Sequence, residues 1–280
     1  MDDEERNLSN FIASALIRSN GYSARIEIDR ILSALSADEK RLEPFGFKVY
    51  SQGDEDGIIE EILSRLEIDQ GVFCEIGVED GLECNTLYLL HKGWTGAWIE
   101  GNKDQLGPIK EKFGPFLGKR LKVSFRSATA ENINSVVAEA IPDKNDIDFL
   151  SIDIDGNDIH LLAKIDFAPK LICIEYNAKF RGNISKAQVY DPERMWTGTD
   201  YFGASLKAIA EVGTSKGYRL VATNLTGSNA FLVRNDLAGA LFPDNCSAEH
   251  LYNPPRYWLI FDHYQNIGHR PDFGPYTDLA

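Results

Sequence analysis

Short apolar runs alternate with amphipathic segments along most of the chain. Five runs have the length of a buried strand: VFCEIG, GAWIE, LKVSFRS, IDFLSIDID and KLICIEYN. Helical spacing follows the first four, at residues 86–90, 105–113, 131–140 and 160–165. A long loop over residues 179–201 follows the fifth and leads to the helical segment SLKAIAEVGTSKG. Repeated strand, helix, strand units predict a parallel sheet with right-handed crossovers.

Two further strand-like runs, YRLVATN and NAFLVR, are separated only by Leu225-Thr226-Gly227-Ser228. A connection this short makes a hairpin, whereas parallel neighbours need a long crossover. The expected fold is therefore α/β, with a Rossmann-like, seven-stranded, mostly parallel sheet that contains one antiparallel strand.

The segment before the sheet has helical character. From Leu8 to Leu35 apolar residues recur at mostly helical spacing, and Asn20-Gly21 interrupts them. This predicts two helices, which fit either a packing cap or the interface of a homo-oligomer. A further helix is expected after Asp54, whose carboxylate can cap it. The expected organisation is a helical extension over residues 1–45, a Rossmann-like domain over residues 46–240 and a C-terminal extension over residues 241–280 that packs on the core.

The turn after the first strand carries the first chemical signal. VFCEIGVEDG places Gly77 and Gly81 around Glu79 and Asp80, and the next strand ends in Glu100. Glycines let a backbone approach a ligand closely, and an acid at the next strand tip can accept both ribose hydroxyls. A dinucleotide site would need the motif G-x-G-x-x-G, which is absent here. The carboxylates of Glu79 and Asp80 would also repel the pyrophosphate of a dinucleotide. The pattern favours a nucleoside that has no phosphate and a net positive charge, such as S-adenosylmethionine.

Ligands in open α/β sheets bind beyond the carboxyl ends of the strands, so the residues at those ends predict the walls of a pocket. Here they are mostly polar: Glu75, Gly77 and Asp80; Glu100; Ser127 and Ala128; Asp153, Asp155, Asn157 and Asp158; Glu175, Tyr176 and Asn177. We expect Ser127 and Ala128 to contact the adenine edge.

SIDIDGND is the second chemical signal. Strand alternation would place Asp153 and Asp155 on one face, where two carboxylates repel unless a positive group or a shared proton lies between them. A sulfonium, a general base with a raised pKa and a divalent cation all satisfy this requirement, as does a simple capping role in a turn. With Glu175 and Asn177 nearby, Asp153 and Asp155 would form an oxygen-rich site of the kind that Mg²⁺ accepts.

Transfer of a methyl group to an alcohol needs alignment of the two reacting atoms and a base for the hydroxyl proton. The candidates are Asp155, Asp153 and His160, which lie on or just after the fourth strand. A single histidine on an amphipathic helix is more often structural, so we place His160 behind Asp155.

Charge and composition exclude several classes of partner. The formal charge of −14 comes without a cluster of Lys and Arg, which argues against nucleic acid. The four cysteines show no metal or disulfide spacing, and no apolar run reaches the roughly eighteen residues of a membrane span. The start MDDEERNLSN is acidic where a signal peptide would be basic. We expect a cytoplasmic protein with no transmembrane segment.

The motifs SQGDEDGIIEEI, FCEIGVEDGLECNTLYLL, GWTGAWIEG, DFLSIDIDGNDIHLL, ICIEYN, YFGASLKAIAEVGTSKGYRLV and GSNAFLVR occur in order between residues 51 and 234. Together they resemble the FkbM-type S-adenosylmethionine-dependent methyltransferases, which have the class I methyltransferase fold. The resemblance implies O-methylation of a sugar or natural-product acceptor. It also implies that Gly77, Asp80 and Glu100 hold the cofactor and that Gln52 and Asp56 approach its methionine end. Glu79 departs from the pattern, because methyltransferases often have glycine there.

Aromatic residues gather in the loop over residues 179–201 and in the tail from residue 253, namely Tyr190, Trp196, Tyr201, Tyr257, Trp258, His263 and Tyr264. They suit stacking on a saccharide, although those of the tail can equally pack that segment onto the sheet. Arg256 and Arg270 could pair with an acidic acceptor. Two other functions fit the sequence. One is a metal-dependent nucleotide-sugar glycosyltransferase that uses the D-x-D at Asp153 and Asp155, and the other is a non-catalytic nucleoside-binding module.

Overall fold

The computed structural model describes residues 3–259 of the chain, and its centre is one seven-stranded sheet. The strands are β1 (Val72–Ile76), β2 (Thr95–Ile99), β3 (Leu121–Ser124), β4 (Ile147–Ile152), β5 (Leu171–Glu175), β6 (Tyr218–Thr223) and β7 (Asn229–Arg234). They lie side by side in the order β3-β2-β1-β4-β5-β7-β6. Pairing is parallel from β3 to β5, and β7 runs antiparallel to both β5 and β6. The predicted fold class is confirmed, including its single antiparallel strand.

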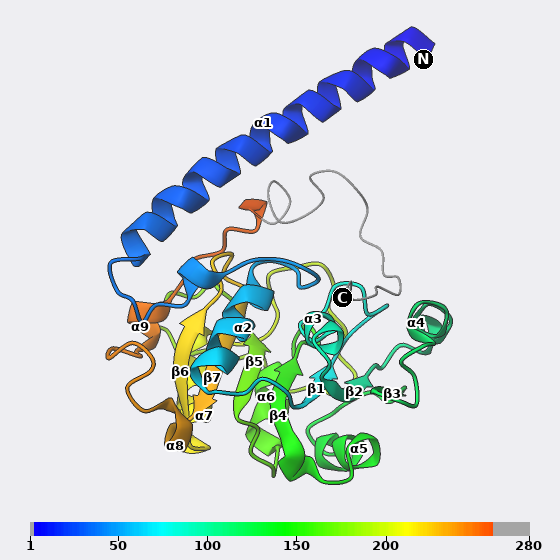
Figure 1. Ribbon diagram of the computed structural model, residues 1–280, viewed down its shortest axis with the longest axis vertical. Helices are drawn as coiled ribbons and strands as arrows, with labels where there is room; N and C mark the ends of the chain where they lie inside the picture. Colours follow the sequence, from blue (N-terminus) through cyan, green and yellow to red (C-terminus); the bar gives the residue numbers. More distant parts are fainter. Residues whose placement is uncertain (1–2, 260–280) are drawn as a thin grey trace, which may run out of the picture.

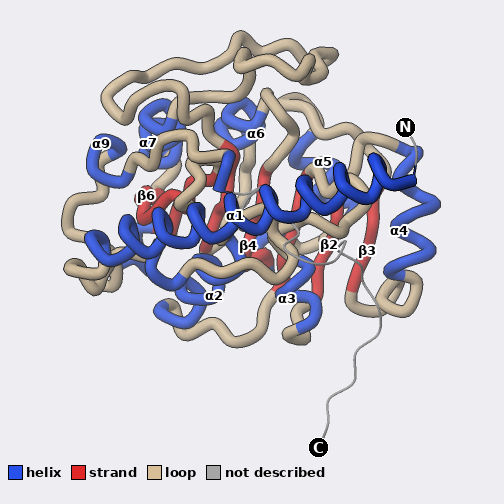
Figure 2. Tube along the Cα trace, turned by 90° about the horizontal axis from the view of Figure 1, so that it is seen from above, coloured by secondary structure: helices blue, strands red, loops and turns tan. Residues whose placement is uncertain are grey.

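Helices cover both faces of the sheet (Figures 1 and 2). They are α2 (Glu55–Arg65), α3 (Leu87–His91), α4 (Leu106–Phe113), α5 (Ile133–Ala140), α6 (Asp158–Lys164), α7 (Leu206–Ser215), α8 (Asn235–Ala238) and α9 (Ala248–Leu251). Alternate residues of each strand point to opposite faces, so each face has its own core. Cys74 and Ile76 of β1 pack with α5, α6 and α7, while Phe73 packs with α2, α3 and α4.

Helix α1 (Asp3–Leu35) corrects the prediction of two helices ahead of the core, because it is one continuous element of 33 residues. Asn20-Gly21 does not end it. A glycine inside a helix costs only about 1 kcal/mol relative to alanine, and without a proline the backbone hydrogen bonds can continue. The helix contacts the rest of the described chain through its second half, where Ala24 and Ile28 pack with Leu225 and Leu259.

The position of α1 relative to the sheet follows from Leu225, which lies in the turn between β6 and β7. This turn is at the carboxyl end of β6, and β6 runs parallel to β1–β5. Helix α1 therefore crosses the edge of the sheet where the parallel strands end, as the view from above shows (Figure 2). Among residues 3–259, no helix is both long enough and apolar enough to cross a membrane.

Candidate functional site

The turn after β1 lies directly against the turn after β4. The amide of Gly77 donates to the carbonyl of Ile99 (2.9 Å), and the amide of Asp153 donates to the carbonyl of Ile76 (3.0 Å). Gly77 has φ +84°, and a Cβ added to it would overlap the carbonyl oxygen of Asp153. Only glycine fits this position, because the backbone of the turn after β4 lies against it. The predicted role of Gly77 in holding the cofactor stays a prediction.

Glu100, at the end of β2, holds the glycine turn. Its Oε2 accepts hydrogen bonds from the amides of Val78 (3.1 Å) and Glu79 (2.8 Å), and its Oε1 accepts one from the amide of Asn102 (2.6 Å). The side chain is buried. A carboxylate offers about four acceptor sites, so three amides leave room for one ribose hydroxyl.

The rest of the turn is acidic and tightly packed. Glu79 has φ +50°, so it adopts the left-handed conformation that glycine usually takes. Burial, and then the nearby Asp155 and Glu100, raises the pKa of the Glu79 carboxyl. Asp80 accepts from the amide of Leu82 (3.0 Å), and Lys112 lies 3.8 Å from its other oxygen. Gly81, at φ +81°, packs against the rings of Trp98 and Phe113, which leave no space for a side chain.

Glu75 has an internal role that its position at a strand tip did not indicate. One carboxylate oxygen accepts from the amide of Asn85 (2.8 Å), and the other accepts from the amide (3.0 Å) and hydroxyl (2.5 Å) of Thr86. Burial raises its pKa. Glu75 thus fixes the start of α3 relative to β1.

The segment before α2 approaches the same edge of the sheet. Oδ2 of Asp56 accepts from the amides of Val49 (2.7 Å), Tyr50 (2.6 Å) and Ser51 (2.9 Å), while its Oδ1 is buried without a partner. Burial raises the pKa of Asp56 to about 6. The side chain of Gln52 is exposed on this loop.

Two acids beside Asp56 connect this loop to the hairpin. Asp54 does not cap α2 as expected, because its carboxylate accepts from the amide of Leu225 (3.0 Å). Oε1 of Glu55 accepts from Asn224 (2.7 Å) and Asn229 (3.0 Å). Asn229 is the direct neighbour of Glu175 across the β5–β7 ladder. The loop that carries Gln52 and Asp56 therefore lies beside the end of β5.

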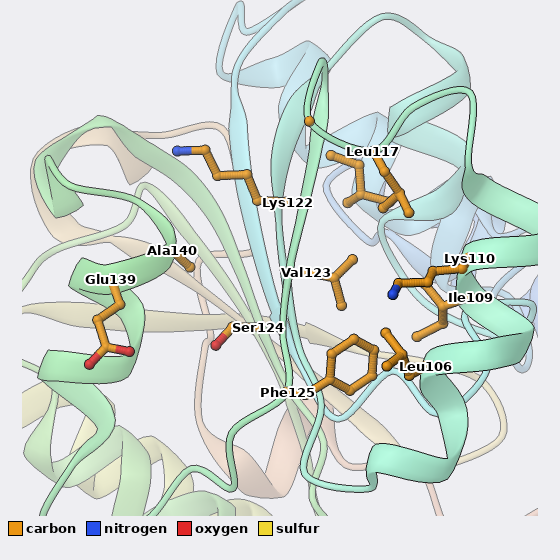
Figure 3. Close-up of a pocket in the computed structure, with 12 residues that line it drawn as sticks. Leu106, Ile109, Lys110, Leu117, Lys122, Val123, Ser124, Phe125, Glu139 and Ala140 are labelled. Atoms are coloured by element: carbon orange, nitrogen blue, oxygen red, sulfur yellow. The ribbon is translucent and has the colours of Figure 1, made fainter.

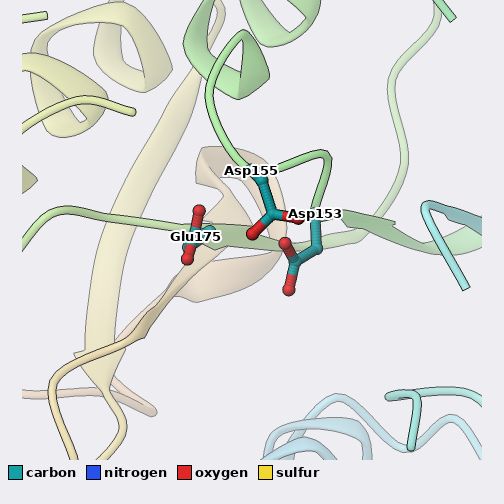
Figure 4. A group of neighbouring side chains, drawn as sticks. All are labelled: Asp153, Asp155 and Glu175. Atoms are coloured by element: carbon teal, nitrogen blue, oxygen red, sulfur yellow. The ribbon is translucent and has the colours of Figure 1, made fainter. Parts of the chain in front are cut away.

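Asp153, Asp155 and Glu175 form one group, and one oxygen from each lies within 4.8 Å of the others. Figure 4 shows the three carboxylates facing one another from the turn after β4 and the end of β5. Asp153, Asp155 and Glu175 come together as expected, but the expectation that Asp153 and Asp155 alternate along a strand was wrong. β4 ends at Ile152, and Asp155 lies beyond it with φ +57°. Asp158 holds this turn by accepting from the amides of Ile154 and Gly156, both at 2.8 Å.

The group brings three acids together, and among residues 3–259 no cationic side chain pairs with them. Burial, and then Asp153 and Asp158, holds the pKa of Glu175 well above its usual range. Burial, and then Asp158 and Asp155, does the same for the pKa of Asp153. In the described chain no Lys, Arg or His forms an ion pair with the three acids, and Oε2 of Glu175 is buried without a hydrogen bond. Such a group needs either bound protons or a cation.

Asn177, which we expected beside these acids, instead holds the loop after β5. Its Nδ2 donates to the carbonyls of Asp200 and Phe202, both at 2.9 Å, and its Oδ1 accepts from the amide of Lys179 (3.1 Å).

His160 also anchors that loop. Its Nε2 donates to the carbonyl of Gln188 (2.9 Å), and its ring centroid lies 5.1 Å from that of Tyr190. The hydroxyl of Tyr190 donates to Glu131 (2.5 Å) and accepts from the amide of Ala130 (3.1 Å). The ring nitrogen that faces Gln188 must carry a proton, since a carbonyl only accepts. A general base needs a ring nitrogen that is free to accept a proton, whereas Nε2 of His160 is used in this structural hydrogen bond.

The tips of β2 and β3 meet as expected. A Cβ added to Gly101, which follows Glu100, would lie 3.1 Å from the hydroxyl oxygen of Ser127. Ser127 is exposed and Ala128 is half-buried. Ser127 and Ala128 therefore lie beside the end of β2, and their contact with adenine stays a prediction.

The aromatic residues divide between exposed and packed positions. Trp196 and Tyr201 are about half exposed, and Arg194 lies over the ring of Tyr201, 4.4 Å from its centroid. Burial, and then the charge of Glu175, raises the pKa of Tyr257 to about 12. Arg256 donates to the carbonyl of Leu225 (2.9 Å) and to Asn253 (3.0 Å). His263, Tyr264 and Arg270 lie outside the described residues.

A groove of about 560 Å³ lies elsewhere, at the free edge of β3 between α4 and α5 (Figure 3). Its walls are mainly apolar and include Leu106, Ile109, Leu117, Val123 and Phe125. No residue that the sequence analysis selected lines it. The groove includes Ser124 at the end of β3 but none of the candidate cofactor-binding or catalytic residues.

No protein-family model matches the sequence, and no curated protein matches it either. Many solved structures are similar, among them three methyltransferases. A candidate caffeoyl-CoA O-methyltransferase from Staphylococcus aureus is 13% identical with a TM-score of 0.44, and the match covers 74% of this chain and 91% of that one. The glycopeptide N-methyltransferase MtfA complexed with sinefungin is 12% identical with a TM-score of 0.40, covering 64% and 86%. A SAM-dependent methyltransferase from Aquifex aeolicus is 15% identical with a TM-score of 0.36, covering 74% and 95%.

Membership of the FkbM-type group stays a prediction, because it depends on the sequence motifs alone. The fold depends on the observed topology. The strand order β3-β2-β1-β4-β5-β7-β6, with β7 as the single antiparallel strand, gives the chain the class I methyltransferase fold.

Proposed function

We propose that the protein is an S-adenosylmethionine-dependent methyltransferase that methylates a hydroxyl group of a saccharide or a similar natural-product acceptor. One observation carries most of this proposal. The glycine turn, Glu100 and the acidic group lie along one edge of the sheet. Glu79 belongs to the same edge, and its burial and the charges of Asp155 and Glu100 raise the pKa of its carboxyl. A ligand with a sulfonium and an ammonium group lowers the free energy of such an edge, whereas a phosphate raises it.

The residues fit the cofactor in order along the edge. Ser127 and Ala128 would contact the adenine and Glu100 would bind the ribose. The turn at Gly77 would let the backbone lie close to the nucleoside. The segment with Gln52 and Asp56 is placed for the methionine end, where the unpartnered Oδ1 of Asp56 can accept from the ammonium group.

The acidic group would serve the acceptor. We assign Asp155, the most exposed of the three acids, as the base. The acceptor oxygen forms a bond to the methyl carbon while the bond from that carbon to sulfur breaks, and the hydroxyl proton passes to the carboxylate of Asp155. The products are the methyl ether and S-adenosylhomocysteine. Trp196 and Tyr201, on the loop after β5, offer exposed rings for stacking on a sugar.

A divalent cation fits the acidic group as well. Oxygens that bind one Mg²⁺ are at most about 4.2 Å apart and those that bind one Ca²⁺ at most about 5 Å. One oxygen from each of the three acids lies within 4.8 Å of the others, so the three are close enough together to share an ion. The unpartnered Oε2 of Glu175 is the kind of hard oxygen ligand that either ion accepts. A bound cation would lower the pKa of an acceptor hydroxyl beside Asp155.

Isothermal titration of the full chain with S-adenosylhomocysteine tests the proposal. We expect binding by the wild type, a loss of at least tenfold in Glu100→Gln and no change in Glu111→Gln, an exposed position on α4. Glu100→Gln also loses acceptor capacity toward its own turn, so circular dichroism must show that it is folded. Absence of binding to the folded wild type would overturn the proposed function.

A further inference from the structure

One face of α1 is apolar and has no partner in the described chain. Large side chains on this face are exposed, with Leu8 at 59%, Ile12 at 48%, Tyr22 at 75% and Ile26 at 70%. They belong to a series whose intervals alternate strictly between four and three residues. The series, called the seam below, is Leu8, Ile12, Ala15, Ser19, Tyr22 and Ile26.

The seam points away from the body of the protein. Successive residues of an α-helix are turned by about 100°, so residues two apart lie on nearly opposite sides. Ala24 and Ile28, which pack on Leu225 and Leu259, are each two residues from Tyr22 or Ile26. The body of the protein therefore packs against one side of α1, and the seam lies on the opposite side. Figure 1 shows the first half of α1 extending past the sheet without a neighbouring helix.

The seam is large enough for a stable contact. With Phe11 (65%) and Leu16 (59%) at its sides, six large residues are half to three-quarters exposed. At roughly 200 Å² for each large side chain, they expose on the order of 700 Å². This exceeds the largest apolar patch of a typical monomer and approaches the ~800 Å² that each partner buries in a standard interface.

The spacing identifies the partner as another helix. Alternation of four and three gives a period of 3.5 residues, which keeps one stripe facing a partner helix in a left-handed coiled coil. We propose that the partner is α1 of a second copy of this chain, in antiparallel orientation.

Side-chain size and charge support this partner. Antiparallel pairing centred on Ile17 places Leu8 against Ile26, Ile12 against Tyr22, and the small Ala15 against the small Ser19. Large residues then meet large ones, and the helices approach closely at the centre.

The charges along the seam favour the same orientation. Antiparallel pairing brings Glu5 close to Arg30 of the second copy, a guanidinium that also pairs with Glu27 of its own chain (2.7 Å), while Arg25 pairs with Asp29 within each copy (3.0 Å). In a parallel pair in register, each charged residue would lie beside the same residue of the second copy, and these like charges would repel.

The first test measures the mass of the full chain by light scattering and sedimentation over a concentration series. We expect twice the 31.3 kDa of one chain. Ile12→Glu should give a monomer. Ile17→Glu should stay a dimer, because Ile17 is equally exposed (53%) on the same helix but lies off the seam. This matched pair separates loss of the interface from loss of helix stability.

The second test measures orientation with a short thiol-reactive cross-linker in a Cys246→Ser background, where the remaining cysteines are buried. Ala15→Cys mixed with Ser19→Cys should cross-link more efficiently than either variant alone. Stronger cross-linking of Ala15→Cys to itself would overturn the antiparallel orientation. A wild type that is monomeric at every concentration, including one that binds lipid vesicles through α1, would overturn the proposal, as would a dimer that Ile12→Glu leaves intact.

Discussion

Gly77 lies so close to the carbonyl oxygen of Asp153 that any side chain at position 77 would overlap it. The contact joins the two turns of the candidate site, since one follows β1 and the other follows β4. The geometry of the site thus depends on a backbone contact between residues that are far apart in the sequence.

Gly77→Ala should destabilise the protein strongly, by on the order of 3 kcal/mol or more, because it adds a steric overlap to a positive φ. Urea unfolding measures the loss. Gly107→Ala is the matched control. A Cβ at Gly107, in α4, meets nothing within 4 Å, and alanine there should be neutral or stabilise by up to about 1 kcal/mol. A Gly77→Ala variant of wild-type stability would show that the two turns do not touch.

A divalent cation should bind the acidic group more tightly at higher pH. Asp153 and Glu175 have raised pKa values, so they hold their protons to a higher pH than ordinary carboxyls do, and a binding cation must displace those protons. Titration calorimetry with Mn²⁺ alone at pH 6 and pH 8 should show at least a tenfold gain at pH 8. Glu175→Gln and Asp155→Asn should abolish it, whereas Glu111→Gln should bind as the wild type does. Binding that persists in both variants would place the ion elsewhere.

His160 should matter for the loop after β5 more than for a proton transfer. His160→Ala removes the donor to Gln188, and Tyr190→Phe removes the hydrogen bonds to Glu131 and Ala130. Limited trypsin digestion should therefore cut faster at Lys186 and Arg194 in both variants. His250→Ala, at an exposed position on α9, serves as the control. An unchanged digestion rate in both variants would contradict the anchoring role.

The free energy of unfolding should fall as pH rises, in part because of Asp54. Burial, and then Glu55, raises the pKa of Asp54 from 3.8 to about 8. Between these two values the folded state holds a proton that the unfolded state has lost, so stability decreases with pH. A single group of this kind contributes a slope of roughly 1.4 kcal/mol per pH unit.

Asp54→Asn should flatten that slope between about pH 4 and pH 8, because asparagine keeps an acceptor for the amide of Leu225 and carries no charge. Urea unfolding at a series of pH values measures it. Equal slopes for the variant and the wild type would show that Asp54 is ionised in the folded state.

The strands β1 and β4 could be predicted closely because nearly all of their residues are buried, which leaves continuous apolar runs such as VFCEIG. The edge where the candidate residues meet followed from the parallel sheet. Local conformation could not be predicted as well. Strand alternation predicted that Asp153 and Asp155 lie together, and they do, but β4 ends before both of them. The left-handed conformation of Asp155 and the hydrogen bonds to Asp158 bring them together. A helix break at Asn20-Gly21 was wrong because both residues weaken a helix without preventing it.

The sequence could not reveal which groups inside the protein form hydrogen bonds with the candidate side chains. Glu75 and Glu100 look alike as acids at strand tips. In the structure Glu75 accepts a hydrogen bond from the amide of Thr86, whereas Glu100 accepts one from the amide of Val78. The predicted division at residues 45 and 240 stays a prediction. Leu42 and Phe242 both belong to the core that packs under β1 and β4, so the core continues past each boundary.

The hydrogen bonds of Glu55 have a consequence for how the chain is made. Its partners Asn224 and Asn229 follow 169 and 174 residues later. During synthesis, at about 5 to 20 residues per second, Glu55 waits roughly ten seconds or more before these partners exist. β7 also enters the sheet between β5 and the earlier-made β6. A nascent chain that stops short of residue 229 therefore has an open sheet edge and a hydrated Glu55, and ribosome-bound chains of increasing length should become protease-resistant only after β7 has emerged.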